Sequence, residues 1–153
     1  MSSNIQTVIM IAKNAGGILL DFYSKNYNVS QKYSDPKVLV TDADLASEKY
    51  IIEELRKSFP NYQIVSEEQR AHAVDWTKEV FLIDPLDGTK QFVAKTPNFS
   101  IIIGLCVSGQ PTLGVVFLPL LGELYFAEKG KGAFFKKRWR SKPNSCFNKK
   151  RPW

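Results

Sequence analysis

Three pairs of acidic residues are the side chains of this sequence best suited to chemistry. In chain order they are Asp42 with Asp44, Glu67 with Glu68, and Asp84 with Asp87. The first pair stands at the start of a predicted helix, and the other two follow predicted strands. The end of a strand can present a carboxylate to a crevice without burying it in the core. Pro85 and Gly88 supply turn chemistry that would let the last pair converge.

The negative charges of clustered carboxylates repel one another unless a cation lies between them. Hard oxygen ligands without His or Cys favour Mg²⁺, which keeps several waters and is often completed by a substrate phosphate. Gly88 and Thr89 open a predicted short helix, so backbone N–H groups after Asp87 could face a phosphate, and Thr89 could hold a water. These parts together predict hydrolysis of a phosphate monoester.

Local chemistry alone leaves plainer interpretations open for each pair. Asp42 and Asp44 are also what a simple helix cap requires. Glu67 and Glu68 are also typical of a solvated loop. The run from Asp84 to Thr89 could be an ordinary β-turn followed by a helix cap.

The elements that must position these residues follow from hydrophobic spacing. Apolar residues at steps of three and four predict a helix over about 4–25, and a second helix runs from Thr41 or Asp42 to about Phe59. The polar stretch from Asn26 to Pro36 predicts a mobile loop or loose hairpin. Strands are predicted at 63–66, 79–83, 100–107, 112–117, 123–127 and 133–135. The fold class is therefore α+β, a helix pair packed on a mostly antiparallel sheet.

Composition indicates one domain over 1–135 and a different ending. The chain has 153 residues, 44% hydrophobic, enough for one core. Its net charge of +6 does not describe the whole chain evenly, because residues 136–153 hold eight of the 21 Lys and Arg residues and no Asp or Glu. Residues 1–135 then hold 13 basic and 15 acidic residues, a net −2. Nucleic-acid binding by this body is not implied.

The remaining composition points to an ordinary intracellular protein. Cys106 and Cys146 form no metal or disulfide pattern, so a reduced, cytoplasmic setting is the simplest expectation. The alternative is a peripheral position at the inner face of the plasma membrane. We expect no transmembrane segment and no signal peptide. Residues 136–153 show neither helical nor strand periodicity and are expected to be disordered.

The run from Asp84 to Thr89 resembles the DP(I/L)DGT signature of the inositol monophosphatase superfamily. Two further blocks arrive in the expected order, Val40–Asp44 and Val65–Glu68, and the resemblance covers nearly all of residues 5–135. The extended run from Leu82 to Phe92 is similar to the CysQ-like branch of 3′(2′),5′-bisphosphate nucleotidases, with Gln91 in place of the usual Glu. Lys90 favours this branch over inositol monophosphatases, which more often have Thr there. The fold implied is the amino-terminal half of the sugar-phosphatase fold.

This resemblance implies roles for single residues. Glu67, Asp84 and the carbonyl of Leu86 resemble the ligands of a first metal, Asp84 and Asp87 those of a second, and Glu67 also reaches a third. The implied cofactor is thus two or three Mg²⁺ ions. Thr89, oriented by Asp44, would activate the nucleophilic water. The substrate-binding positions implied are Glu67, Asp87, Gly88 and Thr89.

Family members run to about twice this length, and their second half carries a W-D-x-A-A motif whose Asp completes the second metal. Trp76, Trp139 and Trp153 all lack a following Asp. We therefore expect a form truncated to the amino-terminal half, its carboxy-terminal domain absent and residues 136–153 an out-of-frame ending. Apolar surface left uncovered on the sheet could be covered in a homodimer.

The expected substrate is a small phosphate ester, most simply a 3′(2′),5′-bisphosphate nucleotide such as adenosine 3′,5′-bisphosphate. An inositol monophosphatase-like or fructose-1,6-bisphosphatase-like activity is the alternative within the same chemistry. A different class of function is a non-catalytic metal-binding remnant, or a nucleic-acid binder acting through residues 136–153. Absence of the second-metal Asp favours weakened activity.

Overall fold

The computed structural model describes residues 2–25, 28–32, 35–69 and 73–137. Within these residues the helices and strands follow one another in this order: α1 (Ser3–Tyr23), β1 (Val29–Lys32), β2 (Asp35–Thr41), α2 (Asp42–Ser58), β3 (Gln63–Ser66), β4 (Glu79–Asp87), α3 (Thr89–Val93), β5 (Ser100–Val107), β6 (Gln110–Leu118), β7 (Glu123–Glu128) and β8 (Gly132–Lys137). The predictions for residues 138–153, disorder and an out-of-frame origin, lie outside the described residues.

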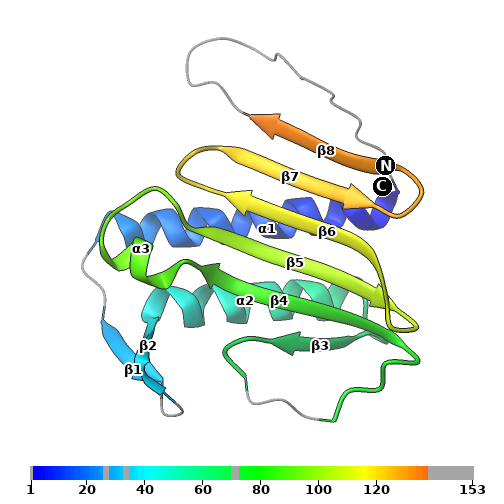
Figure 1. Ribbon diagram of the computed structural model, residues 1–153, viewed down its shortest axis with the longest axis horizontal. Coiled ribbons are helices and arrows are strands. Elements are labelled where there is room, and N and C mark those ends of the chain that lie inside the picture. The colour runs from blue at the N-terminus through cyan, green and yellow to red at the C-terminus, as the bar shows by residue number, and fades with distance from the viewer. Residues whose placement is uncertain (1, 26–27, 33–34, 70–72, 138–153) are drawn as a thin grey trace.

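A six-stranded sheet forms the centre of the molecule, with its strands in the order β3-β4-β5-β6-β7-β8. β3 and β4 are parallel, and each later strand is antiparallel to its neighbour, as in a meander. β1 and β2 form a separate antiparallel hairpin beside the lower end of the sheet in Figure 1. The predicted α+β class is confirmed, and part of the stretch expected to be a loop or loose hairpin is a hairpin.

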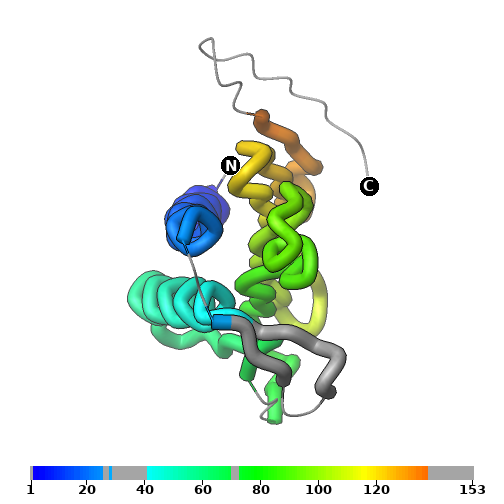
Figure 2. The backbone as a smooth tube through the Cα atoms, turned by 90° about the vertical axis from the view of Figure 1, so that its left-hand side faces the viewer, coloured from blue at the N-terminus to red at the C-terminus, as the bar shows by residue number. Residues whose placement is uncertain are grey.

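Both long helices pack on the same face of the sheet. Figure 2, which views the sheet nearly edge-on, shows α1 and α2 together on one side. Alternate strand residues point at these helices and are fully or nearly fully buried, for example Phe81, Ile101 and Val115. Each such side chain contributes about 1.5–3 kcal/mol of transfer free energy. The helix pair and the meander are therefore joined by one core.

α1 approaches β6 closely because glycine stands at the contact. A Cβ on Gly16 would lie 2.5 Å from Cε1 of Phe117 and 3.1 Å from the Cβ of Pro119. The neighbouring Gly17 is exposed, and a Cβ there would meet nothing within 4 Å. Only the first of these two glycines is required by packing.

α1 is also the one described helix whose length and mean hydropathy would suit a membrane span. Its apolar side faces the sheet, where Val8, Ala12, Ala15 and Leu19 are completely buried. A helix that contributes one face to a protein core meets the same length and composition test. Its apolar character is therefore accounted for by packing on β5 and β6.

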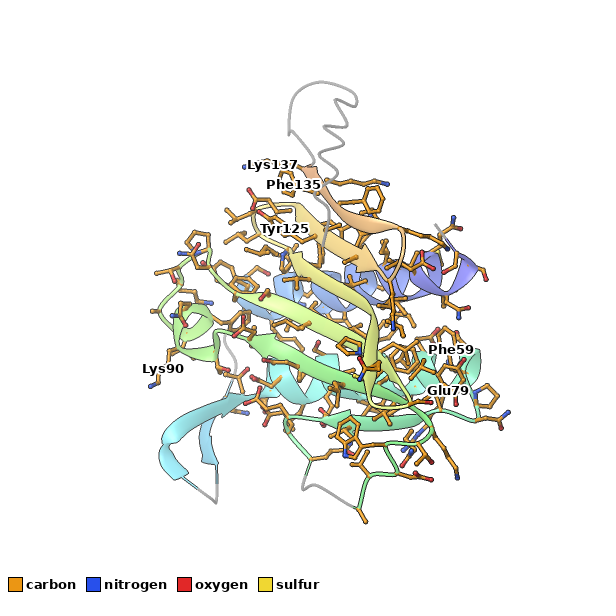
Figure 3. All side chains as sticks on the ribbon, turned by 45° about the vertical axis from the view of Figure 1, so that its right-hand side comes forward. Phe59, Glu79, Lys90, Tyr125, Phe135 and Lys137 are labelled. Carbon is orange, nitrogen blue, oxygen red and sulfur yellow. The ribbon has the colours of Figure 1, made fainter. Side chains whose placement is uncertain are left out.

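The opposite face of the sheet has no helix over it in the described residues. Leu82 of β4 and Tyr125 of β7 keep 37% and 42% of their surface exposed. Tyr125 stacks on Phe135 with ring centroids 4.7 Å apart, and Figure 3 shows the two side by side near Lys137 at the β8 edge. The apolar strand residues thus divide between a buried face and a partly exposed one.

Candidate active site

Asp44 joins the start of α2 to the start of α3. Its Oδ2 accepts hydrogen bonds from the backbone N–H of Thr41 at 2.8 Å and from the Thr41 hydroxyl. The Thr41 hydroxyl in turn accepts from the N–H of Asp44, which completes a capping box. The other oxygen, Oδ1, lies 3.3 Å from Oγ1 of Thr89, which donates to it. The helix-cap interpretation is confirmed, and the same carboxylate contacts the residue that we predicted it would orient.

Burial has an electrostatic effect on Asp44, which is fully enclosed by protein. Loss of solvent raises the pKa of this carboxyl above its usual value, although hydrogen bonds from Thr41 and Thr89 act in the opposite direction. Asp42, two residues earlier, faces elsewhere. Its Oδ2 accepts from the backbone N–H and side-chain amide of Asn28, at 3.1 and 2.8 Å. Of this first acidic pair, only Asp44 contacts Thr89.

Asp84 and Asp87 flank a bulge in β4. We predicted that the strand ends at Ile83, but pairing with β5 continues to Asp84 opposite Ile102, and resumes at Asp87 opposite Ser100. Three steps along β4 thus match two steps along β5, so one extra residue is accommodated. The bulge, and not a turn after the strand, brings the two carboxylates near each other.

Polar groups of the bulge are satisfied locally. The N–H of Leu86 donates to Oδ1 of Asp84 at 3.1 Å, and the carbonyl of Leu86 accepts from the Thr89 hydroxyl at 3.2 Å. This carbonyl oxygen is the one that the resemblance assigned to a metal.

Two serines outside the acidic motifs hold the same bulge, and sequence reasoning missed both. Ser47 of α2, completely buried, donates to the carbonyl of Pro85 at 2.9 Å. Ser100 of β5, 6% exposed, donates to Oδ2 of Asp87 at 2.9 Å. A polar residue on the apolar face of a predicted helix was the available signal for Ser47, since a buried hydroxyl needs a partner.

Glu67 reaches the site from the neighbouring strand. β3 and β4 run parallel, and the N–H of Glu67 donates to the carbonyl of Ile83 at 3.0 Å. This pairing places Glu67 next to Asp84. Burial, followed by the charge of Glu67, a hydrogen bond with it and the charge of Asp87, raises the pKa of Asp84 to about 7. Glu67 and Asp87 therefore both lie close enough to Asp84 to act on it electrostatically.

The donor set suits a hard cation. It consists of carboxylate oxygens and one backbone carbonyl, the ligands that Mg²⁺ prefers. A cation would also favour the charged form of Asp84, whose pKa is raised by burial and then by the charges of Glu67 and Asp87. In the part of the chain that the structure describes, no three acidic, His or Cys side chains already converge as a metal-binding group. Ligand assignments for Glu67, Asp84, Leu86 and Asp87 therefore stay predictions.

Two buried atoms near these elements have no hydrogen-bond partner within the described residues. They are Oε1 of Glu48, one helical turn after Asp44, and Oγ of Ser66, directly before Glu67. Buried polar atoms are usually satisfied, so each has unused capacity for a polar partner.

Gly88 turns the chain from the bulge into α3. Its φ of 87° lies in the left-handed region, and a Cβ there would come within 2.8 Å of the carbonyl oxygen of Asn98. Thr89 can begin α3 next to Leu86 because of this turn. Lys90, the following residue, is exposed and projects from the outer side of α3 in Figure 3.

Comparisons with known proteins agree on one family. The inositol monophosphatase family model matches residues 1–151. A 3′(2′),5′-bisphosphate nucleotidase CysQ from Aggregatibacter actinomycetemcomitans is 39% identical over 134 residues, 85% of this chain and 49% of that protein. A fructose-1,6-bisphosphatase/inositol-1-monophosphatase from Thermotoga maritima is 38% identical over 127 residues, 83% of this chain and 48% of that protein.

Similarity extends to solved structures. The crystal structure of extragenic suppressor protein suhB from Bartonella henselae has a TM-score of 0.82 and 35% identity, covering 90% of this chain and 53% of that one. The chain thus spans about half the length of the relatives that it matches. These relatives bear different functional names, so similarity alone does not select a substrate.

Proposed function

Since the chain belongs to the inositol monophosphatase family, we propose that it hydrolyses small phosphate monoesters with the help of Mg²⁺. The observation that carries this proposal is the meeting of three segments at one place. Asp44 of α2 contacts Thr89 of α3, and Thr89 contacts Leu86 in the bulge between Asp84 and Asp87. Segments distant in sequence thus place a hydroxyl beside acidic oxygens.

We assign the metal-binding role to four residues. Glu67, Asp84 and the Leu86 carbonyl would hold a first Mg²⁺, Asp84 and Asp87 a second, and Glu67 would also reach a third. When bound, the ions would stabilise charge on the phosphate and lower the pKa of a bound water. In support, burial and then the charges of Glu67 and Asp87 raise the pKa of Asp84, and a bound cation would counteract these effects.

Thr89 and Asp44 would handle the proton of the attacking water. The Thr89 hydroxyl donates to Asp44, so its oxygen lone pairs are free to accept a hydrogen bond from a water in the site. Asp44, anchored by Thr41, gives that hydroxyl an acceptor in a fixed position. The phosphate would lie against Glu67, Asp87, Gly88 and Thr89, where Gly88 and Thr89 contribute backbone N–H groups. α3 has only five residues, so individual donors matter there more than a helix dipole.

For the substrate we propose a 3′(2′),5′-bisphosphate nucleotide, of which adenosine 3′,5′-bisphosphate is the simplest example. Lys90 supports this choice, because an exposed cation directly after Thr89 could attract a second phosphate group. The nucleotidase relative, at 39% identity, also supports it. The second candidate is an inositol or fructose phosphate, which the Thermotoga maritima relative favours.

Phosphate release is the decisive measurement. Purified chain is incubated with adenosine 3′,5′-bisphosphate, inositol 1-phosphate and fructose 1,6-bisphosphate, each with Mg²⁺ and with EDTA. We expect Mg²⁺-dependent release, fastest from the nucleotide. Preference for the inositol ester would overturn the substrate assignment. A folded chain that binds Mg²⁺ but releases no phosphate from any ester would instead identify a metal-binding remnant.

The variant Asp87→Asn tests the metal assignment within the same assay. Removing one carboxylate charge while keeping the side-chain shape should reduce Mg²⁺-dependent release to the level seen with EDTA. Glu54→Gln is the matched control, because this half-buried carboxylate of α2 pairs with Lys57 within the described part of the chain and lies outside the acidic bulge. Normal turnover by Asp87→Asn would contradict the assignment.

We also propose a cytoplasmic location and a free small-molecule substrate. Cys106, the cysteine within the described residues, is unpaired, and the net charge of −2 over residues 1–135 does not favour nucleic-acid binding. Sedimentation velocity would decide between a monomer and the homodimer expected from the partly exposed sheet face.

A further inference from the structure

We infer that Ser47 and Ser100 are positioning residues that hold the acidic bulge in the shape required for metal binding. This inference rests on the proposed function, because it concerns the same Asp84–Asp87 segment. Neither serine belongs to an acidic motif. They approach the bulge from different elements, Ser47 from α2 and Ser100 from β5.

A bulge creates the need for such contacts. Between Asp84 and Asp87 the β4–β5 register shifts, so the regular ladder cannot satisfy every backbone group of Pro85 and Leu86. Pro85 has no N–H, and its carbonyl is buried. Ser47 donates a hydrogen bond to this buried carbonyl at 2.9 Å, which offsets the cost of removing it from water.

Ser47 stands where a hydroxyl would be costly without that contact. It is completely buried in the interior of α2, a position where Ala has the higher helix propensity. Serines in helices often bond to a carbonyl of their own preceding turn, but this one bonds to another element. The bond therefore fixes the distance between α2, which carries Asp44, and the bulge, which carries the predicted ligands.

Ser100 acts at the other end of the bulge. It pairs with Asp87 across the β4–β5 ladder, and its hydroxyl donates to one oxygen of the Asp87 carboxylate. Asp87 itself is exposed, so without this contact its side chain would sample several rotamers. Donation to Oδ2 selects one orientation and leaves Oδ1 available. Groups that orient a metal ligand in this way typically affect affinity about 10–100-fold.

The test measures Mn²⁺ binding, with Mn²⁺ standing in for Mg²⁺, by the electron paramagnetic resonance signal of the free ion. Ser47→Ala and Ser100→Ala are compared with two controls. Ser58→Ala makes the same change at an exposed position of α2, and Ser100→Thr keeps the hydroxyl on β5. We expect about tenfold weaker binding for the two test variants, and binding within twofold of the parent chain for both controls.

A second measurement separates failure of this inference from failure of the proposed function. Amide hydrogen exchange at Leu86, whose N–H donates to Asp84, is followed in metal-free protein below the unfolding transition. Faster exchange at Leu86 in Ser47→Ala and Ser100→Ala, but not in Ser58→Ala, supports positioning even if the parent chain binds no Mn²⁺. Absence of Mn²⁺ binding by the parent chain would contradict the proposed function but not the positioning role of the two serines. Unchanged exchange at Leu86, or unchanged Mn²⁺ affinity in both test variants of a chain that binds Mn²⁺, would overturn the inference.

Discussion

The Thr89 hydroxyl lies between two acceptors, Oδ1 of Asp44 and the carbonyl of Leu86, at 3.3 and 3.2 Å. One hydrogen cannot be directed fully at both, so the hydroxyl can turn between them. In either orientation its oxygen faces the acidic bulge. This single residue connects the proton-handling part of the proposed site to its metal-binding part.

Thr89→Ala should therefore lower Mg²⁺-dependent phosphate release about 10²- to 10⁴-fold, the usual contribution of a positioned proton-transfer group. Thr89→Ser keeps the hydroxyl and should retain most of the turnover. Steady-state kcat for the two variants checks this expectation. Equal loss in both would show that the methyl group, and not the hydroxyl, is what the site requires.

Asp84 gives the metal-free protein an unusual dependence on pH. Its pKa is raised from 3.8 to about 7, first by burial and then by Glu67, so the native state binds a proton more tightly than the unfolded state. The resulting stability is present in full below pH 3.8 and is lost as pH rises through about 7. Because Asp84 is partly solvated, we expect a loss on the order of 1–2 kcal/mol.

Calorimetry in EDTA between pH 4 and pH 8 measures this change. The side chain in Asp84→Asn has no proton to lose, so the stability of this variant should depend less on pH over the same range. Saturating Mg²⁺ should reverse the trend for the parent chain, since the ion binds the charged form. A parent curve as flat as that of the Asn variant would contradict the raised pKa.

At the scale of elements, hydrophobic spacing predicted the helices and strands better than the acidic motifs predicted the local backbone around them. The bounds of α1, α2 and most strands were anticipated to within a few residues, because one-sided burial leaves a clear period in the sequence. The continuation of β4 to Asp87 was not anticipated. Pro85 is typical of a turn, and only the pairing with β5, which is a tertiary contact, shows that the strand continues through a bulge.

In the candidate site, too, features marked by sequence motifs were predicted and those that depend on tertiary contacts were not. The contact of Asp44 with Thr89 was predicted and is present, and the Asp84–Asp87 segment lies beside it, although as a bulge and not as the predicted turn. Ser47 and Ser100 were not predicted, because each acts through a contact with a residue distant in sequence, 38 and 13 positions away. Serine is also common on any surface, so its type alone does not indicate a role.

The contact of α1 with β6 gives a matched pair of substitutions at adjacent glycines. Gly16→Ala would place a methyl group 2.5 Å from Phe117, so it should destabilise the fold by about 1–3 kcal/mol. Gly17→Ala meets open space and should stabilise it by about 0.5–1 kcal/mol through helix propensity. Urea unfolding of both variants measures the two free energies. The same sign for both would show that α1 can move away from the sheet.

At the scale of the whole molecule, the start of the chain is fastened to the far part of the sheet. The backbone N–H of Ser2 donates to Oε2 of Glu128 at 3.2 Å, across 126 residues, and Lys131 donates to Oε1 at 2.7 Å. Burial acts to raise the pKa of Glu128, but the hydrogen bonds from Lys131 and Ser2 outweigh it and hold the pKa at about 2. The charged form of this carboxyl is therefore favoured by folding.

Glu128 should change the stability of the fold with pH in the direction opposite to Asp84. Its contribution is present above pH 4.5 and is lost as pH falls toward 2, because the unfolded chain takes up the proton first. The metal-free chain should thus be most stable between about pH 4 and 5. Glu128→Gln should lower the melting temperature at pH 5 and weaken the acid-side slope, as circular dichroism can follow. An unchanged slope would show that other carboxylates dominate acid unfolding.

The carboxylate of Asp44 has one oxygen in the cap of α2 and the other on Thr89. Folding and the proposed chemistry therefore share a single side chain, and mutation cannot separate them at this position. In a library selected only for thermal stability, Asp44 would persist for its cap even after activity had disappeared. Survival of this aspartate among variants would consequently be a poor marker of retained turnover, whereas Thr89, which caps nothing in the described structure, would report on it directly.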